Sequence, residues 1–197
     1  MQLQQQKHQK RPTKGMVIVT NYELVEKQEN GVFVRSKEQN LCPCCGGYLK
    51  VVGSRKRTCI YGSGEKTILV IRRLGCIQCN RVHHELPDIL VPYKRHVRES
   101  IEAVVSGDSA LSVSADECTL GRWKSWFNDM CDYFQGCLKS IAIRSGLESV
   151  EDKSGLPKSK LQRIWHYVGD APGWLARTVR PIVNTNLWTH TRSAFCP

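Results

Sequence analysis

The chain has 197 residues, 41% of them hydrophobic, which is enough to bury a core as one compact domain or as two or three small modules. No stretch approaches the ~20 apolar residues that a membrane-spanning helix needs, and the Gln-rich start lacks the apolar region of a secretory signal. We therefore expect a cytoplasmic protein with no membrane partner. Disulfides are rare in that compartment, so the ten cysteines need another explanation.

The formal net charge is +11 and is unevenly distributed. Residues 41–100 carry eleven basic and four acidic side chains, a net charge of +7, whereas residues 101–155 carry five basic and nine acidic, a net charge of −4. A basic surface attracts polyanions, of which DNA and RNA are the usual examples. The alternative is that the charge serves solubility alone.

Residues 1–92 are predicted to be mainly β structure after a disordered tail. The tail, residues 1–15, is rich in Gln and Lys and has few apolar side chains. Residues 16–92 should form a β domain, whose strands are expected at residues 16–20, 31–35, 48–52, 55–61 and 66–74. Residues 62–65 contain two glycines and predict a tight hairpin turn between the last two strands.

From residue 93 onward, apolar residues recur every three or four positions, which predicts helices. Residues 93–146 should form a helix-turn-helix-like region, with Ser114 and Glu117 as the capping box of a long second helix. Residues 147–197 are interpreted as a C-terminal basic helical segment, in which Pro181 kinks or stops the last helix. The expected fold class is therefore α+β, a small β-rich zinc ribbon followed by an all-α region.

Two Cys-x-x-Cys pairs, Cys42 with Cys45 and Cys76 with Cys79, indicate a metal site. Each pair can place two thiolates on one side of an ion, and zinc prefers four such ligands in a tetrahedron. Asn80 follows the second pair, where a left-handed residue is required. The thirty residues between the pairs exceed the common spacing of about 15–20, and the predicted hairpin accounts for the excess. Four sulfur ligands leave no position for water, so we predict structural Zn²⁺.

Other assignments of the cysteine-rich segment stay open. Cys44 could replace Cys45, although its spacing from Cys42 gives poorer geometry. His83 and His84 could replace a thiolate, but packing or hydrogen bonding beside the site is the better interpretation because four sulfurs already complete it. Two unrelated pairs of reduced cysteines, or a redox dithiol, are further alternatives.

Basic residues on the ribbon and the helices that follow are candidates for phosphate contacts. Side chains alternate along a strand, so Arg55 and Arg57 should share one face. In a helix-turn-helix, Thr119 and Arg122 would reach the major groove. The full candidate set is Arg55, Lys56, Arg57, Arg72, Arg73, Lys94, Arg95, Thr119, Arg122 and Lys124. The simpler alternatives are solvated charge on an edge strand and a plain helical hairpin.

No motif indicates catalysis. A strand-transfer enzyme needs three spaced carboxylates to hold two metal ions, yet Asp170 is the only acidic residue after residue 155. The sequence also lacks a Gly-rich phosphate loop, a Gly-x-Ser-x-Gly elbow and a His-Glu-x-x-His motif. We therefore expect a protein that is not an enzyme.

Residues 41–92 contain Cys-Pro-x-Cys-Gly-Gly, Gly-Ser-Arg-Lys-Arg, Ile-Arg-Arg-Leu-x-Cys-x-x-Cys and Val-His-His-Glu-Leu-Pro-Asp. Together with residues 123–127 and 186–195, these motifs resemble an uncharacterised bacterial and phage domain-of-unknown-function family with a four-cysteine zinc ribbon. That family is similar to the zinc-ribbon and helix-turn-helix N-terminal region of insertion-sequence transposases. The resemblance covers roughly residues 40–130 and the last dozen. It implies zinc and DNA binding and supplies no activity.

We therefore predict a zinc-stabilised, non-catalytic nucleic-acid binding protein with an accessory or regulatory role in a mobile element or phage. DNA is the expected partner, and binding to RNA in place of DNA is a variant of the same hypothesis. The alternative is a protein-interaction adaptor, in which zinc folds a scaffold and the Trp-rich C-terminal region docks a partner protein.

Overall fold

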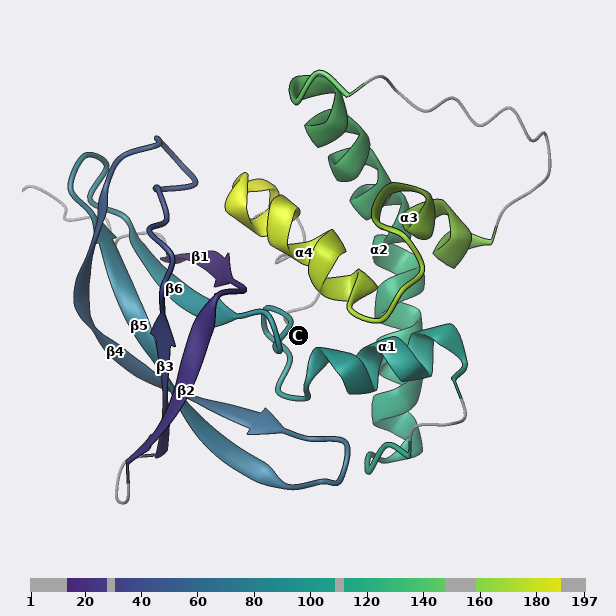
Figure 1. The fold of residues 1–197 in the computed structure, drawn as a ribbon. Helices are drawn as coiled ribbons and strands as arrows, with labels where there is room; N and C mark the ends of the chain where they lie inside the picture. Colours follow the sequence, from purple (N-terminus) through teal and green to yellow (C-terminus); the bar gives the residue numbers. More distant parts are fainter. Residues whose placement is uncertain (1–13, 28–30, 109–111, 148–158, 189–197) are drawn as a thin grey trace, which may run out of the picture.

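The computed structural model describes residues 14–27, 31–108, 112–147 and 159–188. Across these residues the architecture is mixed α/β, with a curled six-stranded sheet followed by four helices (Figure 1). The strands are β1 (Lys14–Val19), β2 (Tyr22–Lys27), β3 (Gly31–Ser36), β4 (Leu49–Ile60), β5 (Lys66–Cys76) and β6 (Val82–Pro87). The helices are α1 (Arg98–Ser106), α2 (Glu117–Arg144), α3 (Lys160–Val168) and α4 (Trp174–Asn184).

Strand β5 organises the sheet, because it pairs with three other strands. Its antiparallel register with β4 runs from Ile60 opposite Lys66 to Leu49 opposite Cys76. Along its other edge β5 pairs with β3 and then with β6, and β2 and β1 extend the sheet beyond them. The β4–β5 register therefore brings the chain before Leu49 next to the chain after Cys76, which is where the two Cys-x-x-Cys pairs lie.

Several strands differ from those expected. The segments predicted at residues 48–52 and 55–61 form one strand, β4, whose register shifts at a bulge between Val51 and Gly53. The sequence pattern predicts neither β2 nor β6. Strand β6 was missed because it carries His-His-Glu where a buried strand usually carries apolar residues. Of the predicted tail, Lys14 and Gly15 belong to β1 and the rest lies outside the described residues.

One continuous core joins the sheet to the helices. Leu69 of β5 belongs to the same buried cluster as Phe134 of α2 and Leu175 of α4. Helix α4 lies between β1 and α2 (Figure 1). The Asn184 side chain accepts a hydrogen bond from Ile18 N at 2.8 Å and donates one to Ile18 O at 3.0 Å, which ties the last helix to the first strand.

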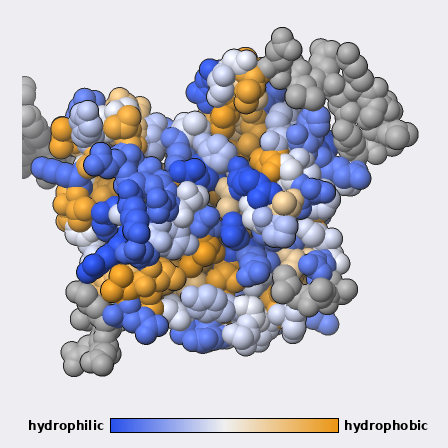
Figure 2. Space-filling model, in the orientation of Figure 1, coloured by the Kyte–Doolittle hydropathy of each residue, from blue (hydrophilic) through white to orange (hydrophobic). Residues whose placement is uncertain are grey.

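The tryptophans of the C-terminal half are mostly core residues, and the buried ones are Trp123, Trp126, Trp174 and Trp188. Hydrophilic side chains cover much of the face shown in Figure 2, with separate apolar patches between them. Among the described residues, none of the helices combines the length and the apolar character needed to cross a bilayer.

The connection between α1 and α2 is longer than that of a helix-turn-helix. α1 ends at Ser106 and α2 begins at Glu117, whereas the motif uses a turn of about three or four residues. The structure thus confirms helices after the sheet. It does not confirm a helix-turn-helix, nor does it confirm a zinc ribbon.

Helix α2 begins one residue after Asp116, and the predicted capping box of Ser114 and Glu117 is wrong. The Asp116 carboxylate accepts hydrogen bonds from Thr119 N at 2.7 Å and Thr119 Oγ1 at 3.0 Å. Asp116→Ala should therefore lower the free energy of unfolding by about 1 kcal/mol. Ser114→Ala is the control and should lower it far less. Equal losses in urea unfolding would contradict this assignment.

The last two helices have caps that the sequence pattern did not reveal. Ser159 and Gln162 form a reciprocal capping box at the start of α3. At the start of α4, the buried Glu102 carboxylate accepts hydrogen bonds from Gly173 N at 3.0 Å and Leu175 N at 2.8 Å. Helix α4 does not stop at Pro181 but continues to Asn184.

Candidate metal centre and basic cavity

The first Cys-x-x-Cys pair lies in the connection between β3 and β4, and its backbone is closed by local hydrogen bonds. Cys42 N donates to Gly47 O at 2.8 Å, and Gly46 N donates to Cys42 O at 2.8 Å. Gly46 has a φ of 72°, a left-handed conformation that glycine adopts without strain. The Cys-Pro-x-Cys-Gly-Gly sequence therefore folds back on itself with both thiols on one side.

The second pair lies in the turn between β5 and β6. Asn80 N donates to Cys76 O at 3.1 Å, and Cys76 N donates to Arg81 O at 2.9 Å. Asn80 has a φ of 55°, which confirms the left-handed residue predicted at this position. Ile77 N also donates to Tyr48 O at 3.3 Å, so the two turns are held against each other.

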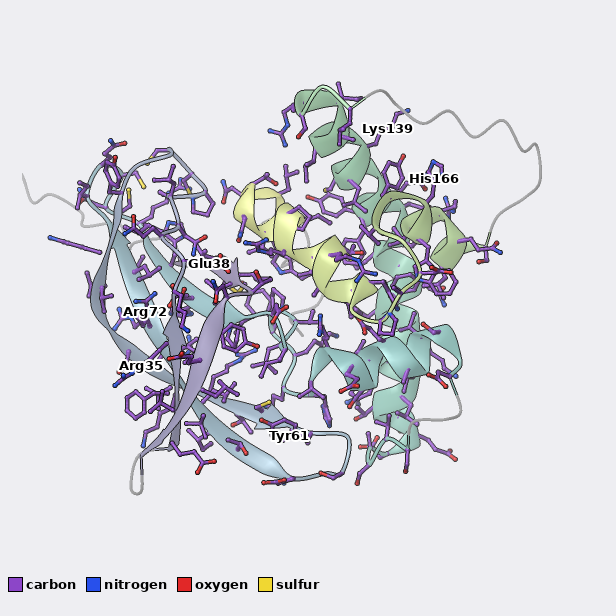
Figure 3. The ribbon with its side chains drawn as sticks, in the orientation of Figure 1. Arg35, Glu38, Tyr61, Arg72, Lys139 and His166 are labelled. Carbon is purple, nitrogen blue, oxygen red and sulfur yellow. The ribbon has the colours of Figure 1, made fainter. Side chains whose placement is uncertain are left out.

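The four sulfur atoms are close enough to hold one metal ion. Cys42 Sγ lies 3.6 Å from Cys79 Sγ, and Cys45 Sγ lies 3.5 Å from Cys76 Sγ. All four lie within 4.8 Å of one another. Zinc–sulfur bonds of about 2.3 Å in a tetrahedron place neighbouring sulfurs about 3.8 Å apart. The donor set and its spacing are therefore consistent with zinc, and sulfur atoms gather at this end of the sheet in Figure 3.

Two of the thiols have strongly shifted pKa values. Burial raises the pKa of Cys42 to about 12. The backbone N–H of Cys79, followed by that of Gln78, donates toward Cys76 Sγ and lowers the pKa of Cys76 to about 6. Thiols must lose their protons to bind a metal ion. A cation is therefore the partner that allows four closely spaced thiolates, two of them buried, to form together.

Of the two histidines predicted to lie beside the four sulfurs, His83 does so, whereas His84 faces Arg55. The His83 ring is 0% exposed, and its Nε2 lies 3.3 Å from Cys42 Sγ. Burial lowers the pKa of His83, which favours the neutral ring. Cys44 faces a different partner, since its sulfur accepts a hydrogen bond from Arg81 Nη1 at 3.1 Å. Cys42, Cys44 and His83 form a second possible ligand group, which shares Cys42 with the first.

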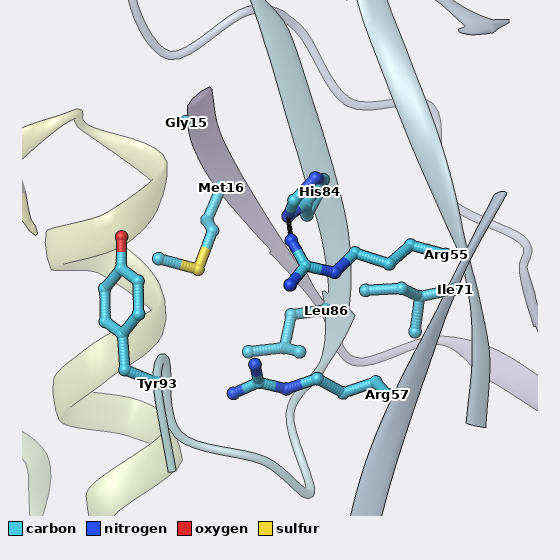
Figure 4. A pocket seen from close by; sticks show the side chains of 8 residues that line it. All are labelled: Gly15, Met16, Arg55, Arg57, Ile71, His84, Leu86 and Tyr93. Atoms are coloured by element: carbon cyan, nitrogen blue, oxygen red, sulfur yellow. Dashed lines mark hydrogen bonds between the residues drawn. The ribbon is translucent and has the colours of Figure 1, made fainter. Parts of the chain in front are cut away.

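Two of the predicted phosphate contacts, Arg55 and Arg57, line a cavity of about 250 Å³. Figure 4 shows both side chains reaching into it from β4, with Tyr93 on the far side. Arg55 Nη1 lies 3.5 Å from His84 Nδ1, and Arg57 Nη2 donates to Lys94 O at 2.9 Å. The complete lining is Gly15, Met16, Arg55, Arg57, Ile71, His84, Leu86 and Tyr93. None of these described residues is acidic.

Positive charge is concentrated at this cavity. Burial lowers the pKa of Arg57, and the neighbouring charges of Arg55 and Arg95 lower it further. Among the described residues, Arg57 Nε is buried without a hydrogen-bond partner. Like charges that lower one another's pKa are stabilised when an anion binds between them.

Other predicted contacts have partners inside the protein. Arg72 donates from Nε and Nη2 to both carboxylate oxygens of Glu85, at 2.5 and 2.7 Å (Figure 3 labels Arg72). The Lys94 amine lies 4.6 Å from the centroid of the Trp126 ring, and burial lowers the pKa of Lys94 to about 8. Arg72 and Lys94 are therefore less available to phosphate than Arg55.

The remaining predicted contacts lie elsewhere. Lys56 is exposed on the face of β4 opposite Arg55 and Arg57. Arg73 is the cross-strand partner of His84 and therefore lies on the cavity face of the sheet, but it does not line the cavity. The three on the first turns of α2 are Thr119, Arg122 and Lys124. None of the described residues that line the cavity comes from α2. The structure therefore brings the candidates into separate groups.

Several cavity residues had no signal in the sequence. Gly15 and Met16 fall in or beside the predicted tail, and they reach the cavity because β1 pairs in parallel with β6. Tyr93 stands in the turn before α1. An aromatic residue next to Lys94 and Arg95 was the available hint, since aromatic and basic side chains are mixed in nucleic-acid binding surfaces.

Residues 42–123 match the model of a family described as a domain of unknown function, DUF6431. The chain therefore contains a DUF6431 domain. The match begins at Cys42 and ends at Trp123 in α2, so the DUF6431 domain includes the four clustered cysteines and both cavity arginines. No curated protein and no solved structure matches the chain.

Proposed function

We propose that this protein is a zinc-stabilised, non-catalytic nucleic-acid binding protein, with DNA as the polymer and an accessory or regulatory role in a mobile element or phage. The observation that carries the proposal is the cavity in which Arg55 and Arg57 lie together, with the charge of Arg95 near them and no acidic side chain among the described lining residues. Phosphate is the anion that closely spaced arginines bind best, because a guanidinium can donate two parallel hydrogen bonds to it.

The location of the arginines also supports a polymeric ligand. Arg55 is exposed on β4 and Arg57 is half-buried. Positive charge therefore extends from the solvent into the cavity. Residues 41–100 carry a net charge of +7, which would attract a polyanion before contact. Contacts of this kind position the backbone of a nucleic acid without reading its sequence.

Zinc has a structural role in this proposal. Four sulfur ligands from two turns leave no coordination position for water or substrate. Bound there, the ion would fix the end of the β4–β5 hairpin, whose β4 strand carries Arg55 and Arg57. A zinc ribbon is the interpretation that we give to this arrangement.

The test is nucleic-acid affinity as a function of salt. Arg55→Ala with Arg57→Ala should weaken binding to all sequences alike and reduce the magnitude of the negative slope of log affinity against log salt by about two, because two phosphate contacts are lost. Fluorescence anisotropy with labelled DNA measures both effects, and competition with RNA distinguishes the two polymers.

Lys56→Ala is the matched control, since it removes a neighbouring charge from the opposite face of the same strand. It should change the slope less than the double variant does. Because Arg57 also bonds Lys94 O, Arg55→Ala alone is the second variant if the double one is destabilised. Affinity that does not respond to salt, or no binding at all, rejects the proposal.

A second candidate function, a protein-interaction adaptor, is favoured by apolar side chains exposed around the two cysteine turns. Leu41, Tyr48 and Ile77 are 56%, 73% and 55% exposed, and backbone bonds hold Tyr48 next to both of the others. Exposed apolar groups of this kind often mark contacts with other proteins. Co-purification with one defined protein after nuclease treatment, lost on Tyr48→Ser, would favour this function over nucleic-acid binding.

A further inference from the structure

We infer that the cavity holds one unpaired nucleotide, with its phosphate on Arg55 and Arg57 and its base against Tyr93, so that the ligand is single-stranded nucleic acid. This inference rests on the proposed function and adds to it the strandedness of the polymer. It is carried by three features of the cavity: an aromatic ring at its mouth, an apolar floor and a basic wall.

Tyr93 provides the ring. Its side chain is 50% exposed, although it lines the cavity. Its backbone has a φ of 64°, a left-handed conformation that is a marked outlier for a bulky aromatic residue. Such strain persists where the surrounding structure enforces it, most often at binding sites. A strained backbone that holds an aromatic ring half in solvent is well suited to stacking.

The floor of the cavity is apolar, unlike a site built for phosphate alone. Met16 and Leu86 lie between Tyr93 and the arginine head groups, and Ile71 lies between the stems of the two arginines (Figure 4). A free phosphate would gain nothing from these side chains, because it has no apolar surface to bury. A nucleotide has both parts: a charged phosphate for the arginines and a flat base for the ring and the methionine.

The size of the cavity favours a single nucleotide over a duplex. Its volume of about 250 Å³ lies just below the range of about 300–1,000 Å³ that is usual for drug-sized ligands. Bases in a duplex are stacked and paired, so their faces cannot reach a ring inside a cavity unless they leave the helix. Single strands expose these faces at no such cost, and aromatic side chains bind them without regard to sequence.

The experiment compares single-stranded and duplex DNA of one sequence, labelled at the end remote from the bound region. We expect the single strand to bind more tightly to the wild-type protein. Tyr93→Ala should weaken single-strand binding by about tenfold or more and leave duplex binding nearly unchanged. Tyr93→Phe keeps the ring and should bind as the wild type does.

Tyr48→Ala is the matched control, because Tyr48 is a more exposed tyrosine that does not line the cavity. Tyr93→Gly is the second variant, since glycine accepts the left-handed backbone and removes the ring without leaving strain. Circular dichroism of each variant confirms that the fold is retained.

A deoxynucleoside 5′-monophosphate provides an independent probe. Titration followed by NMR should shift the resonances of Tyr93 and Met16, with a weaker response to inorganic phosphate. If Tyr93→Ala and Tyr93→Gly bind single strands as the wild type does, while the arginine variants bind weakly, the inference is overturned and the proposed function survives. If no nucleic acid binds at all, the proposed function itself fails.

Discussion

Replacing Cys76 with serine is expected to abolish metal binding and to unfold residues 41–92. Wild-type protein should contain one equivalent of zinc per chain. A structural zinc ion contributes on the order of 10 kcal/mol to folding, more than a small β segment gains from its own core. Cys76 is the end of β5 and one of four sulfurs within 4.8 Å. Elemental analysis measures the metal, and hydrogen exchange measures the loss of protection in β4 and β5.

Cys44→Ser is the matched control, because Cys44 lies between the two ligands of the first turn yet bonds Arg81 outside the four-sulfur set. It should keep its zinc and its protection from exchange. Treating the wild type with a chelator should reproduce the Cys76→Ser result. A metal-free protein that remains fully folded would contradict the structural role of zinc.

The cluster of four cysteines was predictable because its chemistry is local in the sequence. A Cys-x-x-Cys turn with Gly46 or Asn80 after it has few ways to fold, and both left-handed residues appear where the spacing requires them. The hairpin between the two pairs also followed from the two glycines of residues 62–65. Pairing β4 with β5 then brings the two turns together without further information.

The cavity was only half predictable, because its walls come from segments far apart in the chain. Alternation along β4 places Arg55 and Arg57 on one face, as expected. The opposite wall depends on β1 and β6, and neither the parallel pairing of these strands nor the backbone strain at Tyr93 has a sequence signature. Pairing between strands that are far apart in the sequence depends on how the whole core packs.

The sequence also could not show which charges are neutralised. Arg55, Arg57 and Arg72 look alike as basic residues on neighbouring strands. The antiparallel register that sets Arg73 opposite His84 also brings Glu85 beside Arg72. Because β6 was not predicted, its carboxylate could not be assigned as the partner of Arg72. The charge count of a segment therefore overstates the charge available to a ligand.

Arg72→Met is expected to lower the free energy of unfolding strongly, because the Arg72 side chain stabilises the fold. Glu85 is 1% exposed, and Arg72 donates two hydrogen bonds to its carboxylate. Removing the arginine leaves a buried carboxylate without its counter-charge, which typically costs about 3–5 kcal/mol. Arg73→Met is the control on the next residue of the same strand and should cost about 0.5 kcal/mol or less. Urea unfolding measures both.

A double variant separates the cost of the unpaired carboxylate from the cost of altered packing. Arg72→Met with Glu85→Met removes both charges, and apolar replacement of a buried ion pair is often neutral or stabilising. Most of the stability lost in Arg72→Met should therefore return. If Arg72→Met is as stable as Arg73→Met, the pair does not hold β5 to β6, and Arg72 becomes free to bind phosphate on the face of the sheet opposite Arg55. The unfolding data thus decide whether Arg72 belongs to the core or to the nucleic-acid surface.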